Sequence, residues 1–133
     1  MKRILVVLAV MLFAFACGSN QKSSEAGTSQ STINEILKRG ELHVGLEAGY
    51  MPFELKNKQG DIIGFDVDMA QRLANDMGVK LVLVNTAWDG IIPSLLTKKF
   101  DIIMSGMTIT ANRNLQVNFA NPYITIGQTV LIH

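Results

Sequence analysis

The chain contains the apolar run Phe100-Asp101-Ile102-Ile103-Met104, which passes directly into Ser105-Gly106-Met107-Thr108-Ile109-Thr110-Ala111-Asn112-Arg113. The first run predicts a buried strand, and the second places a glycine, hydroxyl groups and a cation just after it. Open α/β sheets bind ligands beyond the carboxyl ends of their parallel strands. Arginine offers a planar fork of donors that suits a carboxylate, so the stretch indicates capture of a small anionic or zwitterionic molecule. An ordinary loop, with Thr110 capping a short helix and a solvated Arg113, explains the same residues equally well.

The rest of the chain alternates between expected strands and helices. Apolar runs predict strands at 42–46, 81–84 and 102–104. Helices are expected from a capping box of Thr32 and Glu35, from Asp66 as a cap through Met77, and from Trp88 onward. The core-facing residues expected after Trp88 are Ile92, Leu95, Leu96 and Phe100. The alternation predicts an α/β fold, a small, mostly parallel sheet with helices on both faces.

Two shorter segments complete the expected order of elements. Asn57-Lys58-Gln59-Gly60 is typical of a turn between two short extended runs. The last apolar residues, 124–132, predict a further extended run.

The beginning of the chain is typical of an exported protein. Lys2 and Arg3 precede an unbroken apolar run, Ile4 to Ala16, which is too short to cross a bilayer comfortably and predicts a signal peptide at residues 1–16. Residues 17–31 are rich in Ser, Gln, Gly and Thr and predict a flexible tether. The folded domain is therefore expected at residues 32–133.

Cys17 is the only cysteine of the 133 residues, so no internal disulfide is possible. Ala14-Phe15-Ala16-Cys17 resembles a bacterial lipobox, whose cysteine is acylated and becomes the mature N-terminus. A free thiol, or ordinary cleavage nearby, is the alternative. We expect the lipoprotein type of signal, and a protein tethered by lipid to the membrane.

Composition excludes several classes of partner. Residues 1–16 hold two basic residues and no acidic one, so the formal charge falls from +1 to −1 when they are removed. A chain without a basic stripe is not expected to bind nucleic acid. The sequence has no Cys/His cluster that predicts a metal site, and no motif that predicts a cofactor.

Taken together, the motifs resemble the bacterial extracellular solute-binding proteins for polar amino acids. They occur in the family's order and cover nearly all of residues 32–133. The matching pieces are Val44-Gly45 with Glu47, Tyr50-x-Pro52-Phe53-Glu54, Gly64-Phe65-Asp66-Val67-Asp68, Trp88-Asp89-Gly90-Ile91-Ile92-Pro93, Phe100-Asp101, Ser105 to Thr110 with Arg113, and Phe119-x-x-Pro122-Tyr123.

The resemblance implies a fold and a function. Family members have two α/β lobes of the type II periplasmic-binding-protein fold, and a ligand binds between the lobes. Residues 32–133 correspond to the first lobe and end at the hinge strand. The implied function is the substrate-binding component, truncated or partial, of an ABC-type amino-acid importer. Its partners are a polar amino acid and a membrane permease, and its place is the periplasm or the cell surface.

The resemblance also implies the ligand-binding residues. Arg113 would hold the α-carboxylate of the ligand, and Thr108 with the backbone of Gly106 would bind its main-chain groups. Ser105 belongs to the same set. The side chain of the ligand would be flanked by two aromatic residues and met by one acidic residue, which are Tyr50, Trp88 and Glu47. On the residues alone, Trp88 is equally an aromatic that covers a helix start, and Glu47 a solvated strand end.

The matched region contains no counterpart of the second lobe, so three hypotheses stay open. The first is the importer component, whose isolated half-site should bind weakly. The second is a sensory or interaction module that associates with itself or a partner through exposed Tyr50, Phe53, Trp88 and Met107. The third is an enzyme, because some relatives of this architecture are dehydratases of prephenate-like acids. The sequence shows no nucleophile–base pair, so we expect no catalysis.

Acylation of Cys17 is directly testable. Cells that express the chain in the presence of a radioactive fatty acid should label the wild-type protein and not the Cys17→Ser variant, because the thiol is the acceptor. An unlabelled wild-type protein, or label that survives the substitution, would contradict the prediction.

Overall fold

The computed structural model is organised around one central strand. Strand β1, Glu41–Leu46, pairs in parallel with β4, Lys80–Asn85, on one side and with β5, Ile102–Ile103, on the other. The register aligns Leu46 with Asn85, and Gly45 with Ile103. The predicted small parallel sheet of an α/β fold is therefore confirmed, and the third strand ends one residue earlier than expected.

The structure describes residues 27–127, 129, 130 and 132, with side chains from Thr32 onward. The predicted signal peptide, Cys17 and most of the predicted tether lie outside the described residues. The chain divides after Gln30 into two units, and the sheet and the site belong to the second. Within the described part, none of the helices is both long and apolar enough to span a bilayer.

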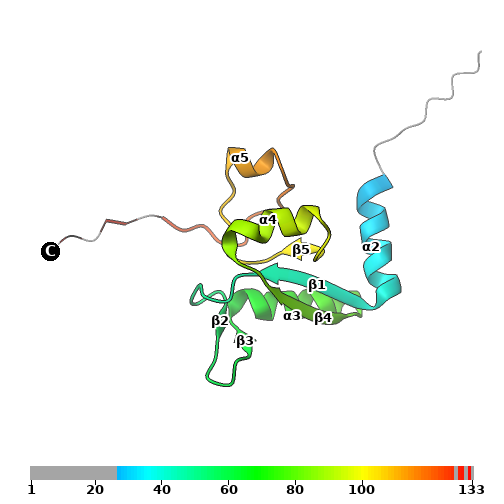
Figure 1. Ribbon diagram of the computed structural model, residues 1–133, viewed down its shortest axis with the longest axis horizontal. Helices are drawn as coiled ribbons and strands as arrows, with labels where there is room; N and C mark the ends of the chain where they lie inside the picture. The colour runs from blue at the N-terminus through cyan, green and yellow to red at the C-terminus, as the bar shows by residue number, and fades with distance from the viewer. Residues whose placement is uncertain (1–26, 128, 131, 133) are drawn as a thin grey trace, which may run out of the picture. The chain divides into compact units, whose positions relative to one another are not determined.

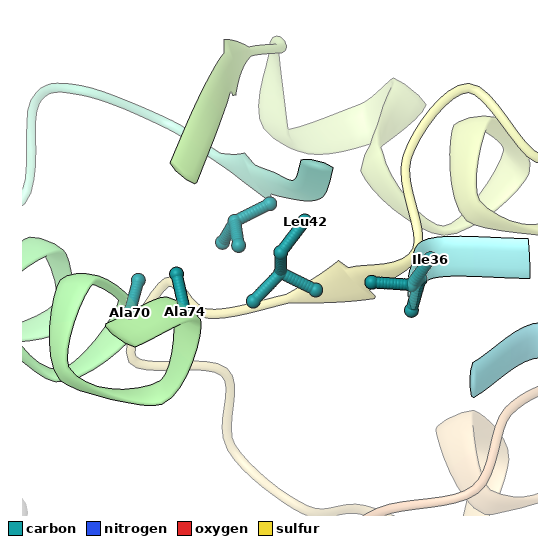
Figure 2. Close-up of a cluster of buried hydrophobic side chains, with 5 residues drawn as sticks. Ile36, Leu42, Ala70 and Ala74 are labelled. Carbon is teal, nitrogen blue, oxygen red and sulfur yellow. The ribbon is translucent and has the colours of Figure 1, made fainter. Parts of the chain in front are cut away.

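Helix α3, Phe65–Met77, covers one face of the sheet, and α4, Trp88–Leu96, covers the other (Figure 1). Helix α3 ends at Met77, as the sequence predicted, and the next residue, Gly78, has a left-handed backbone (φ 69°) that suits glycine. Two alanines of α3, Ala70 and Ala74, are fully buried and let the helix approach the strand closely. They form the core together with Ile36, Leu42 and Val44 (Figure 2).

The face of β1 that carries Gly45 packs against the Phe100 ring. A Cβ atom at Gly45 would lie 2.3 Å from Phe100 Cζ, so only glycine admits the ring at this position. On α4 the buried residue is Ile91, while Leu96 is 57% exposed. Of the four residues predicted to face the core, Phe100 is buried, Ile92 and Leu95 are partly buried, and the prediction is wrong for Leu96. The helix turns Ile91 toward the sheet and ends at Leu96, where solvent reaches the side chain.

Helix α2, Gly27–Arg39, begins five residues before Thr32. The predicted capping box is therefore wrong, because Thr32 lies inside the helix, and the last five residues of the predicted tether are helical. Residues 27–31 are Gly, Ser, Thr and Gln, which favour turns and caps over helix interiors, and this explains the misplaced boundary.

The predicted turn at residues 57–60 is confirmed. It joins β2, Leu55–Lys56, to β3, Ile62–Ile63, in an antiparallel hairpin. Among the described residues beyond Asn121, the expected extended run forms no strand, and its apolar side chains are exposed, as at Ile126 and Val130.

Candidate functional site

An open pocket of about 850 Å³ lies where the three parallel strands end. Parallel strands run in one direction, so their carboxyl ends meet at one edge of the sheet. All seven residues that the sequence singled out for ligand binding line this pocket. The lining residues are Glu47, Ala48, Gly49, Tyr50, Asn85, Thr86, Ala87, Trp88, Ser105, Gly106, Thr108 and Arg113.

Arg113 lies on α5, Ala111–Asn114, a single turn that follows β5. Thr110 caps this turn, and its side chain accepts a hydrogen bond from the Arg113 N–H at 3.3 Å, as the loop interpretation expected. The guanidinium is nevertheless not simply solvated. It donates to the Thr108 carbonyl at 2.8 Å and lies 5.3 Å from the centre of the Trp88 ring, a cation–π geometry. Among the described residues Arg113 makes no ion pair.

Glu47 follows the last residue of β1, and its charge is opposite in sign to that of Arg113. Its Oε1 accepts a hydrogen bond from the Trp88 N–H at 3.2 Å, at the first residue of α4. A carboxylate is stabilised there by the positive end of the helix dipole. Glu47 and Arg113 are the only charged residues among those that line the pocket, so its wall carries one anion and one cation.

The Ser105 hydroxyl and the Gly106 N–H form hydrogen bonds within the protein. The buried Ser105 hydroxyl donates to Glu54 Oε1 at 2.5 Å and accepts from the Glu47 N–H at 3.1 Å. The Gly106 N–H donates to Asp66 Oδ2 at 2.7 Å. In this conformation these two residues shape the wall, and the Gly106 N–H is already hydrogen-bonded within the protein.

Glu54 and Asp66 stand behind this wall, and sequence reasoning did not find them. The sequence predicted that Asp66 caps a helix, but the cap is Gly64, and Asp66 is the second residue of α3 and fully buried. Its carboxylate faces inward because Gly106 and the Tyr123 hydroxyl both donate to it. Burial, and then the neighbouring Asp66, raise the pKa of Glu54 to about 7, although the hydrogen bond from Ser105 acts in the opposite direction.

The aromatic loop contributes one exposed ring and one buried ring. Tyr50 and Phe53 stack with ring centres 5.1 Å apart. Tyr50 is 44% exposed at the pocket, whereas Phe53 is only 8% exposed. The expectation that Phe53 is part of an exposed apolar patch is therefore wrong, because the ring is enclosed by Tyr50 and Phe65.

Two polar residues of the lining, Asn85 and Thr86, were also missed. Asn85 Oδ1 accepts from the Ala48 N–H at 2.9 Å and so joins the ends of β4 and β1. The signal was present, since both residues follow the apolar run 81–84 as Ser105 follows 102–104. Among the described residues no group of three or more His, Cys, Asp or Glu side chains is placed to hold a metal ion.

Residues 42–133 match the bacterial extracellular solute-binding proteins, family 3. The chain belongs to this family. Membership indicates an exported protein, and the fold described above is that of one type II periplasmic-binding-protein domain.

Two curated relatives are similar over most of the chain. The cyclohexadienyl dehydratase of Pseudomonas aeruginosa is 40% identical over 116 residues, which are 87% of this chain and 43% of the relative. The L-cystine-binding protein TcyJ of Escherichia coli K12 is 35% identical over 126 residues, which are 95% of this chain and 46% of the relative. The chain thus spans less than half the length of either protein.

A solved structure of a single domain is also similar. The arginine-bound form of domain 1 of TmArgBP superposes with a TM-score of 0.66 and 54% sequence identity. The match covers 67% of this chain and 71% of that domain.

Gly106 is where the shape of the pocket wall is most sensitive to substitution. Its φ is +53°, and a Cβ atom would lie 2.7 Å from Tyr50 Cε1. Gly106→Ala should therefore lower the free energy of unfolding by about 1–3 kcal/mol in urea denaturation, through overpacking and a left-handed backbone.

Gly127→Ala is the matched control, because a Cβ atom at Gly127 meets nothing within 4 Å. The control should change the free energy of unfolding by less than about 0.5 kcal/mol. Equal denaturation midpoints for the two variants would contradict the close contact between Gly106 and Tyr50.

Proposed function

We propose that the chain is the ligand-binding lobe of an amino-acid-binding protein that serves an ABC-type importer, and that it does not catalyse a reaction. One observation carries the proposal. Arg113 is half-buried at the pocket, held by Thr108 and Trp88, and within the described residues no carboxylate neutralises it. A positioned guanidinium without an anion suits the α-carboxylate of an amino acid.

The proposed pose follows from the groups around Arg113. The carboxylate of the ligand binds the guanidinium edge that Thr108 does not occupy. Since only its carbonyl is bonded among the described residues, the Thr108 hydroxyl is available to the same carboxylate. The Gly106 carbonyl accepts from the ammonium group of the ligand. The rings of Tyr50 and Trp88 flank its side chain.

Glu47 favours a ligand with a basic side chain. It is the only acidic residue in the lining, and only its Oε1 is hydrogen-bonded among the described residues. The second oxygen, Oε2, is therefore available to a guanidinium or ammonium group. The arginine-bound state of domain 1 of TmArgBP supports this choice of ligand class. We propose L-arginine as the first ligand to test.

The same comparison bears on how tightly one lobe can bind. An open half-site lacks the contacts and the water exclusion of a closed cleft, and a millimolar dissociation constant corresponds to only about −4 kcal/mol. Domain 1 of TmArgBP nevertheless holds arginine. Measurable but weak binding by this chain is the expectation. We further propose that the protein delivers its ligand to a membrane permease and is tethered to the membrane by a lipid on Cys17.

A dehydratase is the second candidate, because a relative with that activity is 40% identical. Dehydration needs a general acid at the substrate. Glu47 is the only carboxyl group in the lining, and its Oε1 is bonded at the start of α4. Glu54, whose pKa is raised to about 7, does not line the pocket. These positions favour binding over catalysis.

Isothermal titration calorimetry with L-arginine tests the proposal. Arg113→Ala should weaken binding by about tenfold to a hundredfold, because a charge-assisted hydrogen-bonded contact is worth about 1.5–3 kcal/mol. Arg72→Ala is the matched control, since Arg72 pairs with Asp76 on the surface of α3 and does not line the pocket.

Equal binding by the two variants would contradict the role of Arg113. Turnover of prephenate by the same wild-type preparation would overturn the assignment as a binding protein.

A further inference from the structure

Two buried carboxyl groups meet behind the pocket wall. Glu54 precedes β2 and Asp66 lies in the first turn of α3, and both are 0% exposed. Each holds one of two consecutive wall residues. Glu54 Oε1 accepts from the Ser105 hydroxyl at 2.5 Å, and Asp66 Oδ2 accepts from the Gly106 N–H at 2.7 Å. The pair therefore fixes the point where the chain leaves β5 and enters the pocket.

The remaining oxygens of the pair lack a donor. Glu54 Oε2 and Asp66 Oδ1 are buried, and within the described residues neither has a hydrogen-bond donor. Asp66 also acts on Glu54 directly, since its charge and a side-chain hydrogen bond between the two groups both raise the pKa of Glu54. Two buried carboxylates without a donor between them would repel each other, and the free-energy cost of their desolvation would not be compensated.

In the part of the chain that the structure describes, no cation pairs with either carboxyl group. The ionisable groups that face Glu54 are Asp66 on α3, Glu47 after β1, and Tyr123 from the C-terminal segment. None of the ion pairs among the described residues includes Glu54 or Asp66. Tyr123 donates its hydroxyl proton to Asp66 Oδ2 at 2.9 Å, and burial and Asp66 raise the pKa of this phenol. Tyr123 is thus a neutral donor and not a counter-charge.

We propose that Glu54 and Asp66 share one proton, which Glu54 Oε2 donates to Asp66 Oδ1, and that this pair positions Ser105 and Gly106 in the pocket wall. Every buried polar atom of the cluster then has a partner. Ser105 donates to Glu54, and Glu54 donates to Asp66 Oδ1. The Gly106 N–H and the Tyr123 hydroxyl donate to the other oxygen of Asp66, Oδ2. Loss of the proton leaves two adjacent negative charges and loosens the wall.

The sign of the pH effect follows from the protonation of Glu54. Its pKa rises from 4.5 to about 7 in the folded chain, so the folded state holds a proton that the unfolded state has released. The stabilisation is fully present below about pH 4.5 and is lost as the pH rises through about 7. The wild-type unfolding midpoint should therefore fall between pH 5 and pH 8.5 through this group.

Glu54→Gln tests the shared proton without removing the hydrogen bonds. The amide of the variant donates to Asp66 Oδ1 and its oxygen accepts from Ser105, so it imitates the protonated acid and cannot titrate. Thermal unfolding of the full chain should lose the fall between pH 5 and pH 8.5 in this variant. Glu35→Gln, at an exposed position of α2, is the matched control and should keep the wild-type profile.

Asp66→Asn supplies the opposite arrangement. Its amide can donate to an ionised Glu54 while its oxygen still accepts from Gly106, so the pH step should shrink in this variant, although burial of Glu54 still raises its pKa. In the double variant two amide NH₂ groups face each other, and the loss of stability should exceed the sum of the single losses. Additive losses would contradict direct contact between the two groups.

Carbon-13 NMR of the Glu54 carboxyl group in the wild-type chain gives a readout that does not depend on the folding of any variant. A titration midpoint near 7 supports the proposal. A midpoint near 4.5, or identical pH profiles for the wild type and Glu54→Gln, would overturn it. All of these measurements are made without ligand, so they stand or fail independently of the proposed function.

Discussion

The parallel pairing of β1 with both of its neighbours is the constraint on which the rest of the structure depends. It brings three separate stretches of sequence to one edge of the sheet, where Glu47, Thr86 and Ser105 follow the strands. Side chains alternate between the two faces of β1. Leu42 and Val44 therefore pack in the core beneath α3, and Gly45 faces the Phe100 ring. Packing on both faces holds the strands, and the strands in turn hold the pocket.

The pocket wall is built in two layers. The lining layer presents a cation, an anion and aromatic rings to solvent, chiefly through Arg113, Glu47 and Trp88. The supporting layer consists of Glu54 and Asp66, which are buried behind the lining and orient its backbone. Buried polar groups are tolerated only when they are hydrogen-bonded, so the supporting layer also specifies one arrangement of the loop after β5.

The sequence was informative where local pattern decides structure. Apolar runs predicted the three strands, and the polar residues after them predicted the pocket edge, including Arg113. The buried carboxyl groups were not predictable in this way, because an acidic residue at a helix start is normally solvated. Glu54 contacts Ser105 across 51 positions of the chain, so its burial depends on packing that no local window contains. The same applies to Ile91, since tertiary contact sets the rotation of α4.

The most direct test of the account is an amide NMR titration of the wild-type chain with L-arginine. The account predicts saturable shifts that cluster at the carboxyl ends of β1, β4 and β5 and around Arg113, with little change in the β2–β3 hairpin. No saturable shift, or shifts centred on the hairpin, would contradict the claim that the ends of the three parallel strands form an amino-acid site.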